Sequence, residues 1–279
     1  MPIHDRGYRR YRRRRERHGR AWWVIARAGL LERVRERRFL ALLLFAWSPF
    51  VVRAVQIYVS ASFTQASFLA PSAGTFREFL DQQSLFIFFV TMYAGSGLIA
   101  NDRRANALQI YLSKPLTRVE YVAGKLLTLG IFLTAVTWVP AMLLLLLQVM
   151  CAGSTAFVRD NLFLLPAITV FCAIQVLVSS LAMLALSSLS KSRRFVAILY
   201  AGVIFFAAAT YQVLRAITGS TAWAWISPDD TFDILGDAIF RLPPGTALPL
   251  PAAILVVAVL AAGSAFILER RVRPVDIVT

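Results

Sequence analysis

The chain has 279 residues, of which 58% are hydrophobic and 16% are charged, and it carries a net charge of +15. Soluble domains have about 25% charged residues, so this composition excludes an ordinary soluble domain. The two cysteines, Cys151 and Cys172, lack the number and the spacing of a disulfide framework or a metal knuckle.

Residues 1–38 are expected to form a basic cytoplasmic arm that ends in an interfacial helix. The arm contains the run RRYRRRRERHGR. Such a run binds anionic lipid head groups, with about 1 kcal/mol for each basic residue near the surface. A nucleic-acid-binding arm is the alternative, but arginines beside a first membrane helix also set topology, so no nucleic acid partner is expected. Within 21–38 the apolar residues have helical spacing, and Trp22 and Trp23 are typical of the membrane interface. This predicts an amphipathic helix on the inner leaflet.

Six apolar runs follow, each close to the roughly 20 residues that a membrane-spanning helix needs. Helices are expected because lipid cannot satisfy open backbone groups. We therefore predict an all-α integral membrane protein with a six-helix transmembrane domain at 39–268 and a cytoplasmic tail at 269–279. The predicted spans are 39–59, 84–100, 126–150, 162–189, 195–214 and 248–268.

The positive charges indicate how these helices are oriented. Of the 30 Lys and Arg residues, 25 lie in the segments that face the cytoplasm if both termini are inside, and only four lie in the outer segments. This is a positive-inside distribution, which places the N-terminus and the C-terminus in the cytoplasm. The inner segments are 1–38, 101–125, 190–194 and 269–279.

Three residues within the spans stand out. Pro49 and Pro140 predict kinks in the first and third helices, because proline removes a backbone hydrogen bond and clashes with the preceding turn. Arg53 is the charge within a predicted span. It either lines a substrate path or extends to the outer head groups.

The outer segment 215–247 has two features. Four of its apolar residues have the spacing of an amphipathic interfacial helix, and four aspartates lie among them. We interpret the aspartates as a solvated outer face, with cation binding as the alternative. The apolar residues are Phe232, Leu235, Ile239 and Leu242, and the aspartates are Asp229, Asp230, Asp233 and Asp237.

The inner loop at 101–118, NDRRANALQIYLSKPLTR, is more regular than a linker requires. Its apolar residues follow the i, i+3, i+4, i+7 spacing of one helical face, and Asn101 or Asp102 can cap the helix start. Pro115 ends the helix and forces Lys114 out of helical geometry. The residues on the apolar face are Ala105, Leu108, Tyr111 and Leu112.

A new helix is expected directly after this stop. Thr117 and Glu120 have the spacing of a capping box, with Thr117 as the N-cap and Glu120 at N3. The helix then runs through Gly124 and Lys125 into the third span. The loop is therefore predicted to be a short, rigid helix that is held by helices at both ends and can transmit force.

The stretch GSGLIANDRRANALQIYLSKPLTRVEYVAGKLL, residues 95–127, resembles the equivalent part of type-2 ABC transporter permeases. In that family a helix that ends in small residues is followed by an acidic residue next to a basic one, and then by the pattern L..YLS.P..R..Y..GK. The layout of six spans with both ends inside is also similar, most of all to the branch often linked with maturation of respiratory copper enzymes. The matching residues are Asp102, Arg103, Leu108, Tyr111, Leu112, Ser113, Pro115, Arg118, Tyr121, Gly124 and Lys125.

The resemblance implies that the loop is a coupling helix that sits in a groove of a separate ATPase. It implies two ATPase subunits that bind ATP and Mg²⁺, a second permease subunit that is identical or homologous, and export across a bacterial inner membrane. The candidate ATPase-contact residues are Asp102, Arg103, Arg104, Asn106, Gln109, Lys114 and Arg118, and the helix stop and caps are Pro115, Thr117 and Glu120.

The sequence disfavours other classes of membrane protein. The motif G-x-x-x-x-G-K-[ST] does not occur, so no phosphate loop is expected in this chain and ATP hydrolysis is assigned to a partner. No acidic residue or histidine lies within the predicted spans, which argues against an intramembrane enzyme and a proton-coupled transporter. We therefore expect no catalytic residue, metal site or cofactor here. A membrane scaffold without a substrate path is the alternative function.

Overall fold

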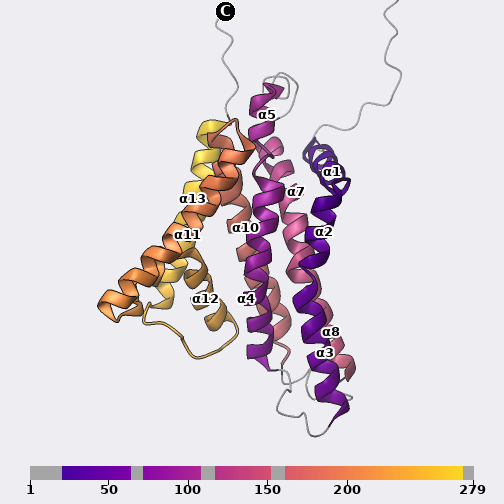
Figure 1. The fold of residues 1–279 in the computed structure, drawn as a ribbon, viewed down its shortest axis with the longest axis vertical. Coiled ribbons are helices and arrows are strands. Elements are labelled where there is room, and N and C mark those ends of the chain that lie inside the picture. Colours follow the sequence, from indigo (N-terminus) through magenta and orange to yellow (C-terminus); the bar gives the residue numbers. More distant parts are fainter. Residues whose placement is uncertain (1–20, 64–71, 108–116, 152–160, 273–279) are drawn as a thin grey trace, which may run out of the picture.

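The computed structural model describes residues 21–63, 72–107, 117–151 and 161–272, which form helices with no strand among them (Figure 1). Six helical stretches are long and apolar enough to span a membrane. The prediction of an all-α membrane protein with six spans is confirmed, whereas the orientation of the termini stays a prediction. The elements are α1 (Ala21–Val34), α2 (Arg37–Phe45), α3 (Ser48–Ser62), α4 (Ala73–Val90), η2 (Thr91–Gly95), α5 (Ala100–Arg104), α7 (Arg118–Val136), α8 (Trp138–Cys151), α10 (Leu164–Leu189), α11 (Arg193–Thr218), η3 (Thr221–Ile226), α12 (Pro228–Ile239) and α13 (Leu250–Arg271).

Helix α10 lies at the centre of the bundle. It packs against α4, α7 and α8 on one side and against α11 and α13 on the other (Figure 1). Helices α2 and α3 lie beyond α4 and α8, and α12 contacts α4, α10, α11 and α13 in the angle between them. Helices α4 and α10 are largely buried, whereas α3, α11 and α13 expose many large apolar side chains. This division fits a bundle whose outer helices face lipid.

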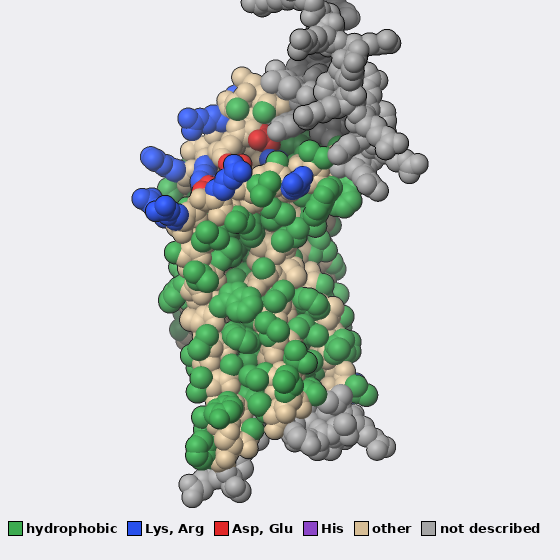
Figure 2. All heavy atoms as spheres, turned by 90° about the vertical axis from the view of Figure 1, so that its right-hand side faces the viewer, with side chains coloured by type: hydrophobic (Ala, Val, Ile, Leu, Met, Phe, Trp, Pro, Cys, Tyr) green, Lys and Arg blue, Asp and Glu red, His purple; other side chains and the backbone are tan. Residues whose placement is uncertain are grey.

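The two ends of the bundle differ in charge. Helices α1 and α5 and the first turns of α7 and α11 form one end, which we call the basic end. On the face shown in Figure 2, Lys and Arg side chains gather at this end, next to a long hydrophobic stretch. Helix α12 and its aspartates lie away from this end, in the lower half of the bundle (Figure 1). This polarity agrees with the charge distribution from which the topology is predicted.

Helix α1, the predicted interfacial helix, is docked on the bundle. Its contact with α7 is the most extensive between any two described elements. Small residues allow it: a Cβ added to Gly124 would lie 2.7 Å from the Trp22 carbonyl oxygen, and one added to Gly29 would lie 2.9 Å from Thr128 Cγ2. Helix α1 is therefore part of the transmembrane fold, and its place on the inner leaflet stays a prediction.

Both predicted proline breaks are confirmed. Helix α2 ends at Phe45 and α3 begins at Ser48, with Pro49 in its first turn. Helix α7 ends at Val136 and α8 begins at Trp138, with Pro140 two residues further on.

One side chain of α4 joins these two breaks. Gln83 is fully buried, and its Nε2 donates hydrogen bonds to the carbonyl oxygens of Ala46 at 3.2 Å and Val136 at 2.8 Å. Val136 lies four residues before Pro140, so its carbonyl is the one that loses a helical N–H donor. Ala46 lies in the other break. A single amide therefore stabilises kinks in two different spans.

The Gln83 contact predicts a coupled effect of two substitutions. Gln83→Leu should lower stability by about 1–3 kcal/mol, because it leaves a buried carbonyl without a donor. Pro140→Ala restores the N–H that Val136 needs, so the cost of Gln83→Leu should be smaller in the Pro140→Ala background. Thermal unfolding of the four proteins in one detergent, as a double-mutant cycle, checks this. Strictly additive costs would contradict it.

The packing of α1 predicts different outcomes for two glycines of α7. Gly124→Ala should displace α1, because the new methyl group meets the backbone of Trp22. Gly130→Ala is the matched control, since its Cβ would lie 3.8 Å from the nearest atom, which is Cγ1 of Val176. Trypsin should then cleave α1 at the exposed Arg27 faster in Gly124→Ala than in the control. Equal cleavage rates would show that this contact does not hold α1.

Candidate functional site: the anchored loop at the basic end

The second span does not reach the inner loop as one continuous helix. Helix α4 ends at Val90, a π-helical turn covers η2, and residues 96–99 turn before α5 begins at Ala100. The predicted span 84–100 lies within the apolar stretch Ala73–Arg104, but its helix is interrupted after Val90. A π-helical turn and a break leave backbone groups without their usual helical partners, and buried groups of this kind need other ones.

Ser187 of α10 supplies partners at this break. Its Oγ accepts hydrogen bonds from the backbone N–H groups of Ile99 at 3.1 Å and Ala100 at 3.0 Å, and it donates to the carbonyl oxygen of Ser96 at 2.9 Å. The side chain is completely buried. Because a hydroxyl has one proton and two lone pairs, its hydrogen-bonding capacity is fully used. The start of α5 is thus attached to α10.

Two arginines bind carbonyls near the same break. Arg103 Nη1 donates to the carbonyl oxygen of Ser188, in the last turn of α10. Arg193 Nη2 donates to the carbonyl oxygen of Tyr93 in η2 at 2.8 Å, and its guanidinium lies 5.0 Å from the centre of the Tyr93 ring. Cations stabilise the carbonyl ends of helices. Together with Ser187, these contacts join α5, η2, α10 and α11.

A polar cluster attaches the loop to α7. The Asp102 carboxylate accepts a hydrogen bond from the Tyr121 hydroxyl at 2.7 Å and lies 2.7 Å from Lys125 Nζ. The Asp102 and Lys125 side chains are only 18% and 12% exposed, and Tyr121 is fully buried. All three residues belong to the pattern that suggested the family. Their shared role in this structure is to hold the end of α5 against the start of α7.

The seven predicted ATPase-contact residues fall into three groups: those exposed at the basic end, those that point into the bundle, and those outside the described residues. Arg104, Asn106 and Arg118 are exposed at the basic end. Helix α5 ends at Arg104 and Asn106 has a positive φ of 51°, so the prediction of one continuous helix from residue 101 through Ala105 is wrong at this point. Asp102 and Arg103 instead point into the bundle, where they make the contacts described above. Gln109 and Lys114 lie outside the described residues, as does the predicted stop Pro115. Contact with an ATPase stays a prediction for all seven.

The predicted capping box is present. Thr117 Oγ1 accepts a hydrogen bond from the Glu120 N–H at 3.2 Å, and Glu120 Oε2 accepts one from the Thr117 N–H at 3.0 Å. Helix α7 accordingly begins at Arg118. The loop is therefore fixed on both sides of residues 108–116: by α10 and α7 before them and by the cap after them.

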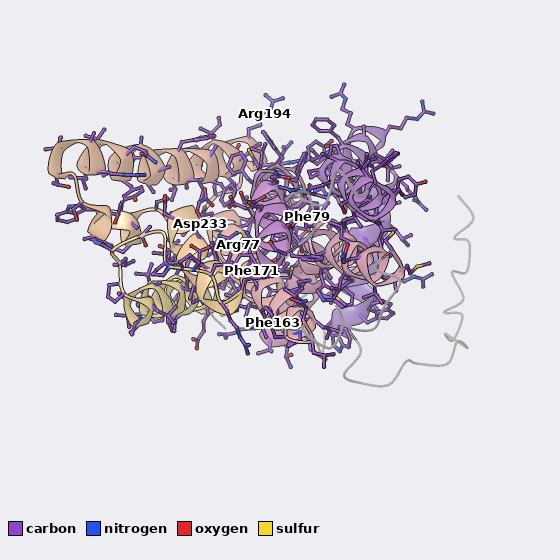
Figure 3. All side chains as sticks on the ribbon, turned by 90° about the horizontal axis from the view of Figure 1, so that it is seen from below. Arg77, Phe79, Phe163, Phe171, Arg194 and Asp233 are labelled. Atoms are coloured by element: carbon purple, nitrogen blue, oxygen red, sulfur yellow. The ribbon has the colours of Figure 1, made fainter. Side chains whose placement is uncertain are left out.

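Sequence reasoning missed Ser187, Ser188, Tyr93 and Arg193. Serines at the end of an apolar helix are common and do not reveal which backbone they will bind. The second inner loop, 190–194, entered the sequence analysis only through its positive charge, yet its Arg193 is part of the anchor. Its neighbour Arg194 is exposed and points away from the bundle (Figure 3).

Arg53 lies far from this site. Its guanidinium makes an ion pair with Glu78 on α4 at 3.0 Å and a hydrogen bond with Gln56 at 3.0 Å, and its side chain is 12% exposed. It thus connects α3 to α4. Neither predicted role, in the substrate path or at the head groups, is needed to explain these contacts.

The fold and this loop define a class of protein: a polytopic α-helical membrane protein in which α7 and α10 hold the start of an inner loop at the basic end. A family model described as "ABC-2 family transporter protein" matches residues 23–267. The chain therefore belongs to the ABC-2 family, which confirms the resemblance to type-2 ABC transporter permeases. Members are the transmembrane components of ABC transporters and work with an ABC ATPase subunit. A search of curated proteins found no match.

The Asp102 cluster predicts that Lys125→Met is more damaging than loss of both charges. The single substitution leaves the Asp102 carboxylate largely buried without its cation, and breaking a buried pair in this way costs about 3–5 kcal/mol. In Asp102→Asn/Lys125→Met no charge is left, so the thermal unfolding temperature should recover in part. An unfolding temperature of the double variant that is no higher than that of Lys125→Met would contradict the role of this pair.

Proposed function

We propose that this chain is the permease subunit of an ABC exporter, and that a separate ATPase drives it through the loop at 101–118. The observation that carries the proposal is the double attachment of this loop. Before residues 108–116, Ser187 and Arg103 join it to α10, and Asp102 joins it to α7. A displacement of the loop must therefore move two spans.

The position of α10 extends this argument. It is the central helix of the bundle and packs against helices on both sides. Well-packed interiors transmit displacement because they contain few voids and compress little. A push at the basic end is thus passed through α10 to α13 and α11, and through α7 to α1 and α8.

The exposed residues at the loop ends form the docking surface in this proposal. Arg104, Asn106 and Arg118 offer charge and hydrogen bonds, and Val119 adds a side chain that is 76% exposed. Asp102 and Arg103 position this surface from inside. An acidic groove on the ATPase would complement the arginines.

The remaining parts of the proposal follow from the family. Two ATPase subunits bind ATP and Mg²⁺, and a second permease, identical or homologous, completes the complex. The complex lies in a bacterial inner membrane with the basic end toward the cytoplasm. Anionic lipid binds the basic arm at 1–20, and the resemblance to the branch linked with copper enzyme maturation stays a prediction.

The docking surface can be tested apart from the anchor. We expect Arg104→Glu/Arg118→Glu to reduce the ATPase that co-purifies with the tagged protein in mild detergent by about tenfold or more, because it reverses two charges at the docking surface. Arg270→Glu/Arg271→Glu makes the same charge change on exposed residues of α13 at the same end and should leave co-purification intact. Arg103 is left unchanged, since its loss would also disturb the fold.

The outcomes distinguish two functions. A phosphate-loop ATPase that is present with the wild type and the control, but lost with the loop variant, supports the permease function and the docking surface. Equal amounts in all three samples would contradict the docking surface. A well-folded wild-type protein that recovers no ATPase would instead favour the membrane scaffold.

A further inference from the structure

A lateral cavity of about 230 Å³ lies between the central and the peripheral helices. Helices α4, α10, α11, α12 and α13 all contribute to its wall. Most of the lining is apolar, and two of the lining residues, Phe205 and Leu260, are 64% and 38% exposed on the lipid-facing helices. The cavity therefore opens toward the surrounding lipid.

The end of this cavity at α12 is polar. Asp229, Gln175 and Ser84 line it there, and the same three residues line a smaller hollow that continues to Asp81 and Asp233. Gln175 is only 5% exposed, and its Oε1 has no hydrogen-bond partner among the described residues. A buried amide oxygen without a donor is costly, and a ligand N–H group at this position would satisfy it.

The hollow next to the cavity is short of positive charge. Arg77, whose side chain is 7% exposed, lies 2.7 Å from Asp233, 3.4 Å from Asp237 and 3.7 Å from Asp81. Figure 3 shows Arg77 between Asp233 and Phe171, and its guanidinium lies 5.2 Å from the centre of the Phe171 ring. One cation thus serves three carboxylates.

Arg77 is also fixed in place. Gly236 packs against its guanidinium so closely that a Cβ at this position would overlap it. No ion pair involves Asp229 within the described part of the chain. The carboxylate that faces the cavity therefore has no cation of its own.

The pKa values of the α12 carboxyl groups agree with this shortage. Partial burial, with Asp81 nearby, raises the pKa of Asp233 to about 7, although Arg77 opposes the shift. Desolvation, with Asp230 and Asp81 nearby, raises the pKa of Asp229 as well, although this residue keeps part of its surface exposed. These aspartates lie on α12, outside the membrane-spanning segments. A bound cation would relieve the repulsion between their ionised forms.

The lining favours an organic cation over a metal ion. No group of three His, Cys, Asp or Glu side chains in the described ranges is arranged to hold a metal. The wall beside Asp229 is instead apolar and includes Phe88, Val178 and Phe232. A carboxylate and an amide oxygen at the end of an apolar cavity match a molecule with an apolar body and an N–H-bearing cationic head.

We propose that this cavity binds an amphiphile with a primary ammonium head group. The ammonium pairs with Asp229 and donates to Gln175 Oε1, and the apolar body lies between α4, α10, α11 and α13. Such a head group belongs either to an aminophospholipid or to a smaller single-chain amine. That this molecule is the transported cargo rests on the proposed permease function, whereas its binding does not.

A second hollow serves as a control site for the labelling experiment below. A groove of about 620 Å³ between α7 and α10 is lined by apolar and small residues and has no charged side chain in its wall. It can take up an apolar body but has no means to select a cation. Labelling of this groove should therefore be independent of the charge of a probe.

The test uses the purified full-length permease alone, in nanodiscs of phosphatidylcholine and phosphatidylglycerol. The probe is a C12 alkyl amine with a photoreactive diazirine, and its uncharged partner is the corresponding alcohol. Mass spectrometry locates the labelled peptides. We expect the amine to label the peptides around Phe88 and Asp229, which line the cavity but not the α7 groove, about tenfold more than the alcohol does. Labelling of the α7 side of the groove, residues 123–135, should be equal for both probes.

Three variants separate charge from fold. Asp229→Asn should abolish the preference for the amine, and Asp229→Glu should retain most of it. Asp230→Asn is the matched control, because Asp230 neighbours Asp229 on α12 but does not line the cavity. Size-exclusion profiles and labelling of the α7 groove establish that each variant is folded. Equal labelling by the amine and the alcohol, or the same loss in both asparagine variants, would overturn the proposal.

Competition identifies the source of the head group. Unlabelled dodecylamine should displace the probe, and failure to do so would overturn the proposal. If phosphatidylethanolamine in place of phosphatidylcholine also displaces the probe, the ligand is an aminophospholipid; if only dodecylamine does, it is a single-chain amine. No ATPase is present in this test. Equal labelling of the wild-type cavity by the amine and the alcohol therefore refutes the ligand class, whereas absence of a co-purifying ATPase refutes only the permease function.

Discussion

The structure depends on the need to satisfy backbone hydrogen-bonding groups inside the bundle, because lipid supplies no partners for them. Three of the six spans are interrupted: near Pro49, near Pro140 and after α4. A side chain from another helix binds the backbone at each break. Gln83 serves the two proline breaks, and Ser187 serves the third. These interruptions therefore determine which helices must lie together.

Helix α10 connects the basic end to the lateral cavity. Helix α10 carries Ser187 at the basic end and Gln175 beside the lateral cavity. Both side chains belong to one continuous helix, α10, which contacts the loop at one position and lines the cavity at the other. In the proposed transporter, this helix would link the ATPase contact to the ligand. The Asp102–Lys125 pair, which is largely buried, holds the loop, and Arg77, whose own side chain is buried, holds α12 through carboxylates that stay partly exposed.

Much of the fold could be predicted from local pattern. Proline positions, the Thr117–Glu120 spacing and the lengths of apolar runs depend on residues close in sequence, and the structure bears out each of them. Local pattern did not reveal features that depend on distant residues. The helix of the second span is interrupted after Val90, and Ser187 of α10 binds the backbone there. Asp233, interpreted as part of a solvated face, is 45% exposed but also contacts Arg77, which lies 156 residues before it.

The sequence by itself determined the class of the protein, the number of spans and the capping box that begins α7, since composition and short-range spacing carry this information. Only the tertiary structure decided which loop residues are exposed and which are anchors. Asp102 and Arg104 were both predicted to contact the ATPase, yet Asp102 pairs with Lys125 and Arg104 is exposed. The physical reason is that a charged side chain takes its role from what the fold places beside it, and no spacing along the chain specifies those neighbours.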